Sequence, residues 1–154
     1  MVDSKMERQD FMRRWFTACA LMLGVAISAA VLSAASADSN QYPEISIKQL
    51  KTAMANKSVT LIDANGTDSY KDGHIPGAID FEAHPNDLAK LLPKDKHALI
   101  VAYCGGPQCM AYRAAAKKAV ELGYTNVQHL VAGISGWEKA GEKMEKGEKS
   151  NKAA

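Results

Sequence analysis

Residues 98–110 read ALIVAYCGGPQCM and include the most apolar of the predicted strands. The run at 98–103 predicts a central strand covered on both faces, because a strand exposed on one face would alternate with polar residues. A glycine-rich turn follows, and the alanine-rich segment at 110–122 predicts a helix closed by Gly123. A buried strand, a turn and a helix in this order are typical of an α/β fold.

Strand-like and helical segments alternate on both sides of this stretch. Short apolar runs predict strands at 45–47, 59–63, 78–81 and 127–130. Helical spacing predicts helices at 48–56, 68–71 and 87–92, and a further short helix around Gly136. Such alternation implies parallel pairing through right-handed crossovers. We therefore expect an α/β fold with an open parallel sheet and helices on both faces.

The composition excludes several classes of protein. Apolar residues make up 47% and charged residues 23% of the 154 residues, as in an ordinary globular domain. The formal net charge of +2 is too small for a protein that binds nucleic acid by neutralising phosphates. Three cysteines are too few for a disulfide scaffold. The histidines His84, His97 and His129 lack the spacing of metal ligands, so we expect no metal.

The first 37 residues have the pattern of an export signal. Basic residues, among them Arg13 and Arg14, precede an apolar run at 16–32, and Ala35-Ser36-Ala37 forms an A-x-A cleavage pattern. We expect cleavage after residue 37 and export to the periplasm of a bacterium. An uncleaved membrane anchor is the alternative, because the apolar run is at the short limit for a membrane-spanning helix.

The rest of the chain divides into three parts by composition. We expect a linker at 38–44, one domain at 45–141 and a charged tail at 142–154. The tail mixes Glu and Lys and is nearly free of apolar residues, so it cannot bury enough surface to offset the cost of ordering. We therefore expect it to be solvated and disordered. The sequence does not define an oligomeric state.

Cys104 lies where an α/β fold binds its ligands, beyond the carboxyl end of the central strand. Gly105 and Gly106 allow the backbone to curl, so that several N–H groups point toward one centre. The positive end of the helix that begins near Met110 adds to the same field. Such a setting lowers the pKa of a thiol and suits the anionic terminal sulfur of a persulfide. The plain alternative is that Cys104 is a small buried residue at the end of a strand.

Five segments resemble the signatures of the rhodanese-like domain family, in the same order and with similar spacing over roughly residues 45–141. They are LID at 61–63, YKDGHIPGA at 70–78, YC at 103–104, GYTNV at 123–127 and GISGW at 133–137. The resemblance implies a five-stranded parallel sheet. It also implies that Cys104 is the catalytic cysteine and carries sulfur as a persulfide, with no separate cofactor.

Two positions depart from the pattern of this family. Members that use thiosulfate usually carry arginine five residues after the cysteine and two residues after the strand aspartate, where this chain has Cys109 and Asn65. Each change removes a planar, permanently charged fork for anions, so we predict weak thiosulfate affinity and favour polysulfide or persulfide donors. The residues that we expect to bind the donor are Gly105, Gly106, Pro107, Gln108, Cys109, Met110 and Arg113.

Cys109 leaves several interpretations open. Four residues separate it from Cys104, so the pair could form a disulfide and act as a redox switch in an oxidising compartment. Cys109 could instead resolve a persulfide on Cys104 and release sulfide, or the pair could clamp a thiophilic metal or metalloid. It could also simply line the start of the helix. We expect Asp63 and His74 to be structural residues near the site, held by hydrogen bonds.

The sequence therefore predicts an exported sulfurtransferase. The Cys104 thiolate would attack the outer sulfur of a small donor, loop N–H groups would stabilise the persulfide, and a thiol or cyanide would then remove the sulfur. A thiol–disulfide switch or a metalloid-binding module that uses Cys104 and Cys109 is the alternative. A phosphatase is excluded, because its loop needs an arginine to clamp phosphoryl oxygens and residues 104–110 contain none.

Overall fold

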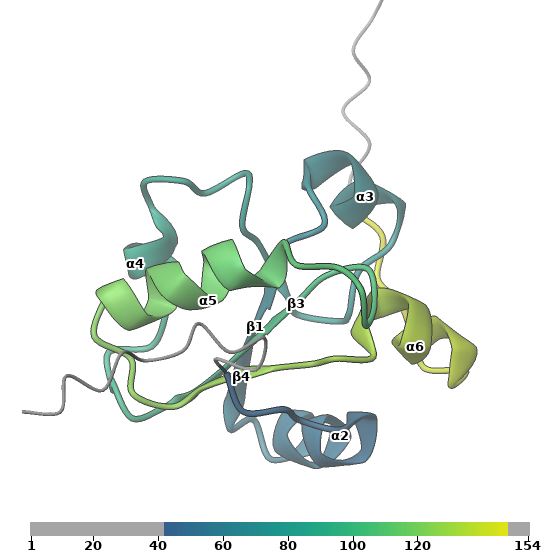
Figure 1. Ribbon diagram of the computed structural model, residues 1–154, viewed down its shortest axis with the longest axis horizontal. Helices are drawn as coiled ribbons and strands as arrows, with labels where there is room; N and C mark the ends of the chain where they lie inside the picture. Colours follow the sequence, from purple (N-terminus) through teal and green to yellow (C-terminus); the bar gives the residue numbers. More distant parts are fainter. Residues whose placement is uncertain (1–41, 148–154) are drawn as a thin grey trace, which may run out of the picture. The chain divides into compact units, whose positions relative to one another are not determined.

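The computed structural model describes residues 42–147, which form a parallel sheet with helices on both faces (Figure 1). The strand order is β2-β1-β3-β4, and β1 (Val59–Asp63) and β3 (Leu99–Tyr103) are the central pair. The outer strands are β2 (Ile79–Asp80) and β4 (Val127–His129), and each of the three pairings is parallel. The α/β fold predicted from the sequence is confirmed.

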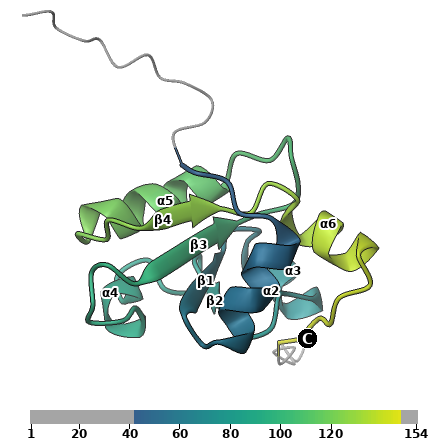
Figure 2. The same cartoon turned by 90° about the horizontal axis from the view of Figure 1, so that it is seen from below.

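β3 is fully buried over most of its length because helices cover both faces of the sheet (Figure 2). The helices are α2 (Ile47–Ala55), α3 (Thr67–Asp72), α4 (Leu88–Leu91), α5 (Tyr112–Glu121) and α6 (Gly133–Lys139). Ile100 and Ala102 pack in a core with α4 and α5, whereas Val101 and Tyr103 pack in a second core with α2 and α6. The prediction of a central strand covered on both faces is therefore confirmed.

Gly123 ends α5, as the sequence predicts. Its φ is +92°, its N–H donates to the Val120 carbonyl, and the N–H of Tyr124 donates to the Ala119 carbonyl. These two bonds form a Schellman motif, which needs a residue that tolerates the left-handed conformation. The helix itself begins at Tyr112, two residues later than the alanine-rich pattern predicts.

The strand expected at 45–47 is reduced to a single bridge between Glu44 and His129. Ser46 is the reason, because its Oγ accepts a hydrogen bond from the Gln49 N–H while the Gln49 side chain accepts one from the Ser46 N–H. This capping box begins α2 at Ile47 and ends the extended chain. Residues 42–147 thus contain four strands, and the expected fifth strand is not among them.

The expected linker and tail differ from the structure where it describes them. Tyr42 is buried and packs edge-on against Tyr112, with ring centroids 6.3 Å apart. At the other end, the N–H of His74 donates to the Glu145 carbonyl at 2.8 Å, and the N–H of Glu145 donates back at 2.9 Å. Backbone pairing needs no apolar side chains, so the charged composition of the tail could not predict this contact.

The predicted signal at 1–37 and residues 148–154 of the predicted tail lie outside the described residues. Between residues 42 and 147, no helix is both long enough and apolar enough to cross a membrane.

Candidate functional site

The loop between β3 and α5 holds both cysteines of residues 42–147. Cys104 directly follows β3, is 0% exposed and packs in the same core as Tyr112. Cys109 is partly exposed, and its Sγ is bonded to the Sγ of Cys104 in a disulfide. The sequence did not decide whether Cys104 and Cys109 form a disulfide. In the structure they do, so neither cysteine offers a free thiol in this state.

The N–H groups of helix α6 bind two backbone carbonyls of the cysteine loop. The N–H of Ile134 donates to the Cys104 carbonyl at 2.9 Å, and the N–H of Ser135 donates to the Gly105 carbonyl at 3.0 Å. A trans peptide directs its N–H away from its own carbonyl. The N–H groups of Gly105 and Gly106 therefore point away from α6.

Gly133 permits this close contact between α6 and the loop. Its φ is +57°, and a Cβ at this position would lie 2.3 Å from the Cys104 carbonyl oxygen and 2.5 Å from the Gly106 nitrogen. No side chain fits there without moving the loop backbone. Sequence reasoning named Gly133 and the buried Trp137 of α6 as parts of a signature but missed this role, since no local pattern reveals which backbone a glycine will meet.

The other side of the loop presents backbone donors that have no acceptor within residues 42–147. Among the described residues, the backbone N–H groups of Gly105, Gly106, Gln108 and Met110 have no protein acceptor, whereas that of Cys109 donates to the Gly106 carbonyl at 2.9 Å. Pro107 and Gln108 form the exposed tip of the turn. Neighbouring unpaired N–H groups are a common way for a protein to hold an anion, and the start of α5 adds positive potential.

Asp63 brings the end of β1 to the same loop. It is 1% exposed, and its Oδ1 accepts hydrogen bonds from the backbone N–H and the side-chain amide of Asn65, both at 2.7 Å. Burial raises the pKa of the Asp63 carboxyl, and the Tyr103 hydroxyl and the Asn65 bonds oppose this rise. Asn65 then faces the loop, since a Cβ on Gly105 would lie 3.8 Å from the Asn65 Oδ1.

His74 has structural partners in the loop between α3 and β2. It is 5% exposed, its Nδ1 lies 2.8 Å from the Tyr70 carbonyl, and its ring stacks on the Tyr70 ring with centroids 3.7 Å apart. Its Nε2 lies 3.7 Å from the Glu145 carboxylate. His74 thus joins α3 to the segment that follows α6.

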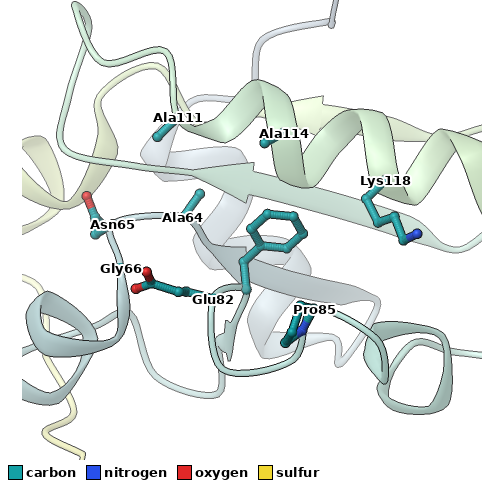
Figure 3. A pocket seen from close by; sticks show the side chains of 9 residues that line it. Ala64, Asn65, Gly66, Glu82, Pro85, Ala111, Ala114 and Lys118 are labelled. Atoms are coloured by element: carbon teal, nitrogen blue, oxygen red, sulfur yellow. The ribbon is translucent and has the colours of Figure 1, made fainter.

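A groove of about 620 Å³ runs beside the loop (Figure 3). Asn65 and Glu82 lie toward one end of the groove and Lys118 toward the other. The sequence did not indicate Glu82 or Lys118, because three segments far apart in the chain form the groove. Its lining consists of Ala64, Asn65, Gly66, Phe81, Glu82, Pro85, Ala111, Ala114 and Lys118.

Arg113, which the sequence offered as a binding residue, is not part of this lining. Ala111, Ala114 and Lys118 share one side of the α5 segment, and the helical repeat of 3.6 residues puts Arg113 on the opposite side. Burial lowers the pKa of His129 to about 4, and the charge of Arg113 contributes to this shift. The charge of Arg113 thus acts on His129, and Arg113 does not line the groove.

These features define a parallel α/β domain with a cysteine-bearing loop at the carboxyl edge of its sheet, which is the edge where such folds bind their ligands. Residues 46–140 match the family model of the rhodanese-like domain. The chain belongs to the rhodanese-like domain family.

Two relatives extend this assignment. The thiosulfate sulfurtransferase GlpE of Pseudoalteromonas translucida is 33% identical over 110 residues, which cover 68% of this chain and 98% of that protein. GlpE of Shewanella oneidensis is 29% identical over 104 residues, which cover 66% of this chain and 97% of that protein. The family and these names support a sulfurtransferase activity in general terms.

Solved structures agree with the fold. A thiosulfate sulfurtransferase from Pseudomonas aeruginosa superposes with a TM-score of 0.58 at 23% identity, over 70% of this chain and 21% of that one. The Alr3790 protein from Anabaena superposes with a TM-score of 0.55 at 24% identity, over 66% of this chain and 91% of that one. At these identities the likeness concerns the fold alone.

Proposed function

We propose that this protein is a sulfurtransferase that carries sulfane sulfur as a persulfide on Cys104 and passes it to a thiol or to cyanide. The observation that carries this proposal is the loop after β3, where a buried cysteine is followed by backbone N–H groups without protein acceptors in the described chain. Membership of the rhodanese-like family and the relatives named thiosulfate sulfurtransferases support the same chemistry.

Sulfur transfer consists of two displacements at one sulfur atom. In the first, the Cys104 thiolate attacks the outer sulfur of the donor, a new S–S bond forms, and the donor bond breaks. The leaving group departs with the electron pair, and it is sulfite when the donor is thiosulfate. In the second, the acceptor attacks the terminal sulfur and Cys104 leaves as a thiolate, so that cyanide gives thiocyanate. The N–H groups of Gly105 and Gly106 stabilise the anionic persulfide between the two steps.

The donor that fits this loop best carries little charge. Thiosulfate is a dianion, and a site that holds it needs compensating positive charge. Cys109 and Asn65 occupy the two positions where arginine would supply that charge, and Arg113 is not among the residues that line the groove. We therefore propose that thiosulfate binds weakly and that polysulfide or persulfide donors react more readily.

The test measures thiocyanate formation by the Cys109→Ser variant, because this variant cannot form the Cys104–Cys109 disulfide and keeps the Cys104 thiolate available as the nucleophile through repeated turnovers. Thiosulfate and an alkyl persulfide, which is a monoanion, serve as donors, cyanide is in excess, and the protein-free rate is subtracted. We expect turnover with both donors and a higher kcat/KM for the persulfide. The Cys104→Ser variant, whose folding is checked by circular dichroism, should lose at least about 10³-fold. Undiminished activity in that variant, or no rate above the protein-free reaction, would contradict the proposal.

We also propose that residues 1–37 direct export and that the protein works in the periplasm. Basic residues before an apolar run and the Ala35-Ser36-Ala37 pattern support this. A disulfide such as Cys104–Cys109 persists more readily in an oxidising compartment. The test is fractionation of a bacterium that expresses the full chain, followed by N-terminal sequencing. A periplasmic chain that begins at Asp38 is expected, whereas a full-length chain in the cytoplasmic fraction would contradict export.

A further inference from the structure

We infer that Cys109 is a resolving cysteine, which attacks the persulfide on Cys104, expels its outer sulfur as sulfide and leaves the Cys104–Cys109 disulfide. This inference rests on the proposed function, because it needs a persulfide on Cys104. It adds an activity beyond transfer to an external acceptor, namely the reduction of sulfane sulfur to sulfide by two thiols of the protein.

The loop already brings the two sulfur atoms together. Cys104 and Cys109 have their Cα atoms 6.1 Å apart, within the range that a disulfide needs, and their Sγ atoms are bonded. The N–H of Cys109 donates to the Gly106 carbonyl and turns the chain back toward Cys104. A Cβ on Gly105 would lie 3.8 Å from the Cβ of Cys109, so the turn is compact. The inner sulfur of a persulfide on Cys104 is the same Sγ atom, and Cys109 therefore competes with external acceptors as an intramolecular nucleophile.

The resolving step balances without any further reagent. The Cys109 sulfur gives up its proton and attacks the Sγ of Cys104, so that the bond between the two cysteine sulfurs forms. The bond between Sγ and the outer sulfur breaks, and the outer sulfur leaves with the electron pair and the proton as HS⁻. The sulfane sulfur is reduced by two electrons, and the two cysteines are together oxidised by two.

The different exposure of the two cysteines determines which sulfur of the disulfide an external thiolate attacks when it regenerates the reduced protein. Cys104 is 0% exposed and Cys109 is partly exposed, so an external thiolate reaches the disulfide at the Cys109 sulfur. Cys104 then leaves as a thiolate beside the N–H groups of Gly105 and Gly106, which favour the departing anion. A second thiol displaces the first from Cys109 as a new disulfide. A dithiol is therefore the class of reductant that completes the cycle.

Cys109 stands five residues after Cys104, where members of the family that use thiosulfate usually carry arginine. An arginine at this position would hold an anionic donor, but it has no electron pair to give to sulfur. A thiol at the same position holds a dianion poorly and supplies two electrons together with Cys104. Cys109 thus contributes, together with Asn65, to weak thiosulfate binding and also makes sulfide release possible.

The test is a single turnover of the reduced protein in the absence of oxygen and added thiol. Millimolar thiosulfate is the probe, because its first product is sulfite and any sulfide must come from the sulfane sulfur. Sulfite and sulfide are measured by chromatography, bound sulfur by its release with cyanide, and the state of Cys104 and Cys109 by mass spectrometry of their peptide. The wild-type protein should release about one sulfite and one sulfide per chain and finish with the disulfide.

Two matched variants separate this inference from the proposed function. Cys109→Ser should release sulfite, release no sulfide and retain one cyanide-labile sulfur on Cys104, whereas Cys104→Ser should release neither product. Sulfite without sulfide from the wild-type protein, with the sulfur still bound, would overturn the resolving role alone. Sulfide release by Cys109→Ser equal to that of the wild type would overturn it as well. Failure of the wild-type protein and Cys109→Ser to release sulfite or bind sulfur would overturn both proposals.

Discussion

The loop at 104–110, between β3 and α5, and the loop at 73–77, between α3 and β2, are both built around glycine and proline, but they use their backbone donors differently. In the loop at 73–77, the N–H groups of His74, Ile75 and Gly77 donate respectively to the Glu145 carbonyl, the Tyr103 hydroxyl and the Glu145 carboxylate. In the loop at 104–110, α6 binds two carbonyls, and the N–H groups of Gly105, Gly106, Gln108 and Met110 have no acceptor within residues 42–147.

The difference separates a structural loop from a ligand-binding one. Both loops contribute to the family resemblance, and their composition alone does not tell them apart. A buried polar group needs a partner, so donors without a protein partner indicate that the partner is a ligand or solvent. By this criterion the N–H groups of the Cys104 loop are open to a ligand or to solvent, and the His74 loop holds β2, β3 and residue 145 together.

The largest expected effect is that of Gly133→Ala compared with Gly77→Ala. Both glycines have a positive φ, +57° and +75°, but a Cβ on Gly77 meets nothing within 4 Å, whereas one on Gly133 meets the backbone of the Cys104 loop at 2.3 Å. We expect Gly133→Ala to lower the free energy of unfolding by about 4 kcal/mol or more and Gly77→Ala by about 1–2 kcal/mol. Urea unfolding measures both, and equal losses would contradict the role of Gly133.

The next effect concerns His129, whose ring stacks on the ring of Tyr112, the first residue of α5. Burial, with a contribution from Arg113, lowers its pKa to about 4, so the unfolded chain, with an ordinary pKa of about 6.5, takes up a proton first as the pH falls. Stability is therefore lost between about pH 6.5 and 4. From pH 7 to 4.5 this loss should be about 2–3 kcal/mol.

His129→Phe keeps an aromatic ring on Tyr112 and removes the titrating group. Unfolding of the wild-type protein and of the variant at pH 7 and pH 4.5 measures the difference. The variant should lose less stability than the wild type by the stated amount. The same acid sensitivity in both proteins would show that other groups cause it.

Tyr103→Phe tests the link between the two loops. The Tyr103 hydroxyl accepts the N–H of Ile75 at 3.0 Å, and both residues are fully buried. Its removal leaves that donor without this acceptor and should cost about 1–2 kcal/mol of unfolding free energy. The hydroxyl bonds to the structural loop and also acts on Asp63, which takes no part in the proposed sulfur-transfer steps, so sulfur transfer per folded molecule should change by less than about twofold. A much larger loss of activity would mean that the two loops are not separable in function.

The smallest expected effect is a gain in affinity from Cys109→Arg. A guanidinium at the end of the cysteine loop can pair with a dianion, so the KM for thiosulfate should fall by about tenfold, or about 1.4 kcal/mol. Cys109→Gln is the uncharged control and should not show this fall. Steady-state thiocyanate formation measures both variants, and an unchanged KM in Cys109→Arg would contradict the account of donor preference.

Much of the fold can be predicted from the sequence because parallel strands that are buried on both faces consist of continuous apolar runs. The strand at 59–63 has the predicted bounds, and β3 differs by one residue. The prediction of a strand at 45–47 is wrong because Ser46 and Gln49 cap a helix there, and these local hydrogen bonds outweigh a short apolar pattern. The composition did not predict the ordered start of the tail, because Glu145 pairs through its backbone with His74 and composition does not encode such pairing.

The candidate site is less predictable than the fold. Cys104 and its loop stand out because the glycines and the helix start are neighbours in sequence. Gly133 gains its role only where α6 meets the loop, and Lys118 and Glu82 line the groove from segments that are distant in the chain. Arg113 was ambiguous because its sequence position does not fix which side of α5 faces the groove.

The most direct test of the central claim locates the transferred sulfur on the Cys109→Ser protein. The reduced variant is treated with polysulfide or with thiosulfate, and the peptide that contains Cys104 is weighed by mass spectrometry before and after treatment with cyanide. We expect one additional sulfur atom on Cys104, which cyanide removes as thiocyanate. No added sulfur from either donor, or sulfur found on another residue and retained in a Cys104→Ser protein, would contradict it.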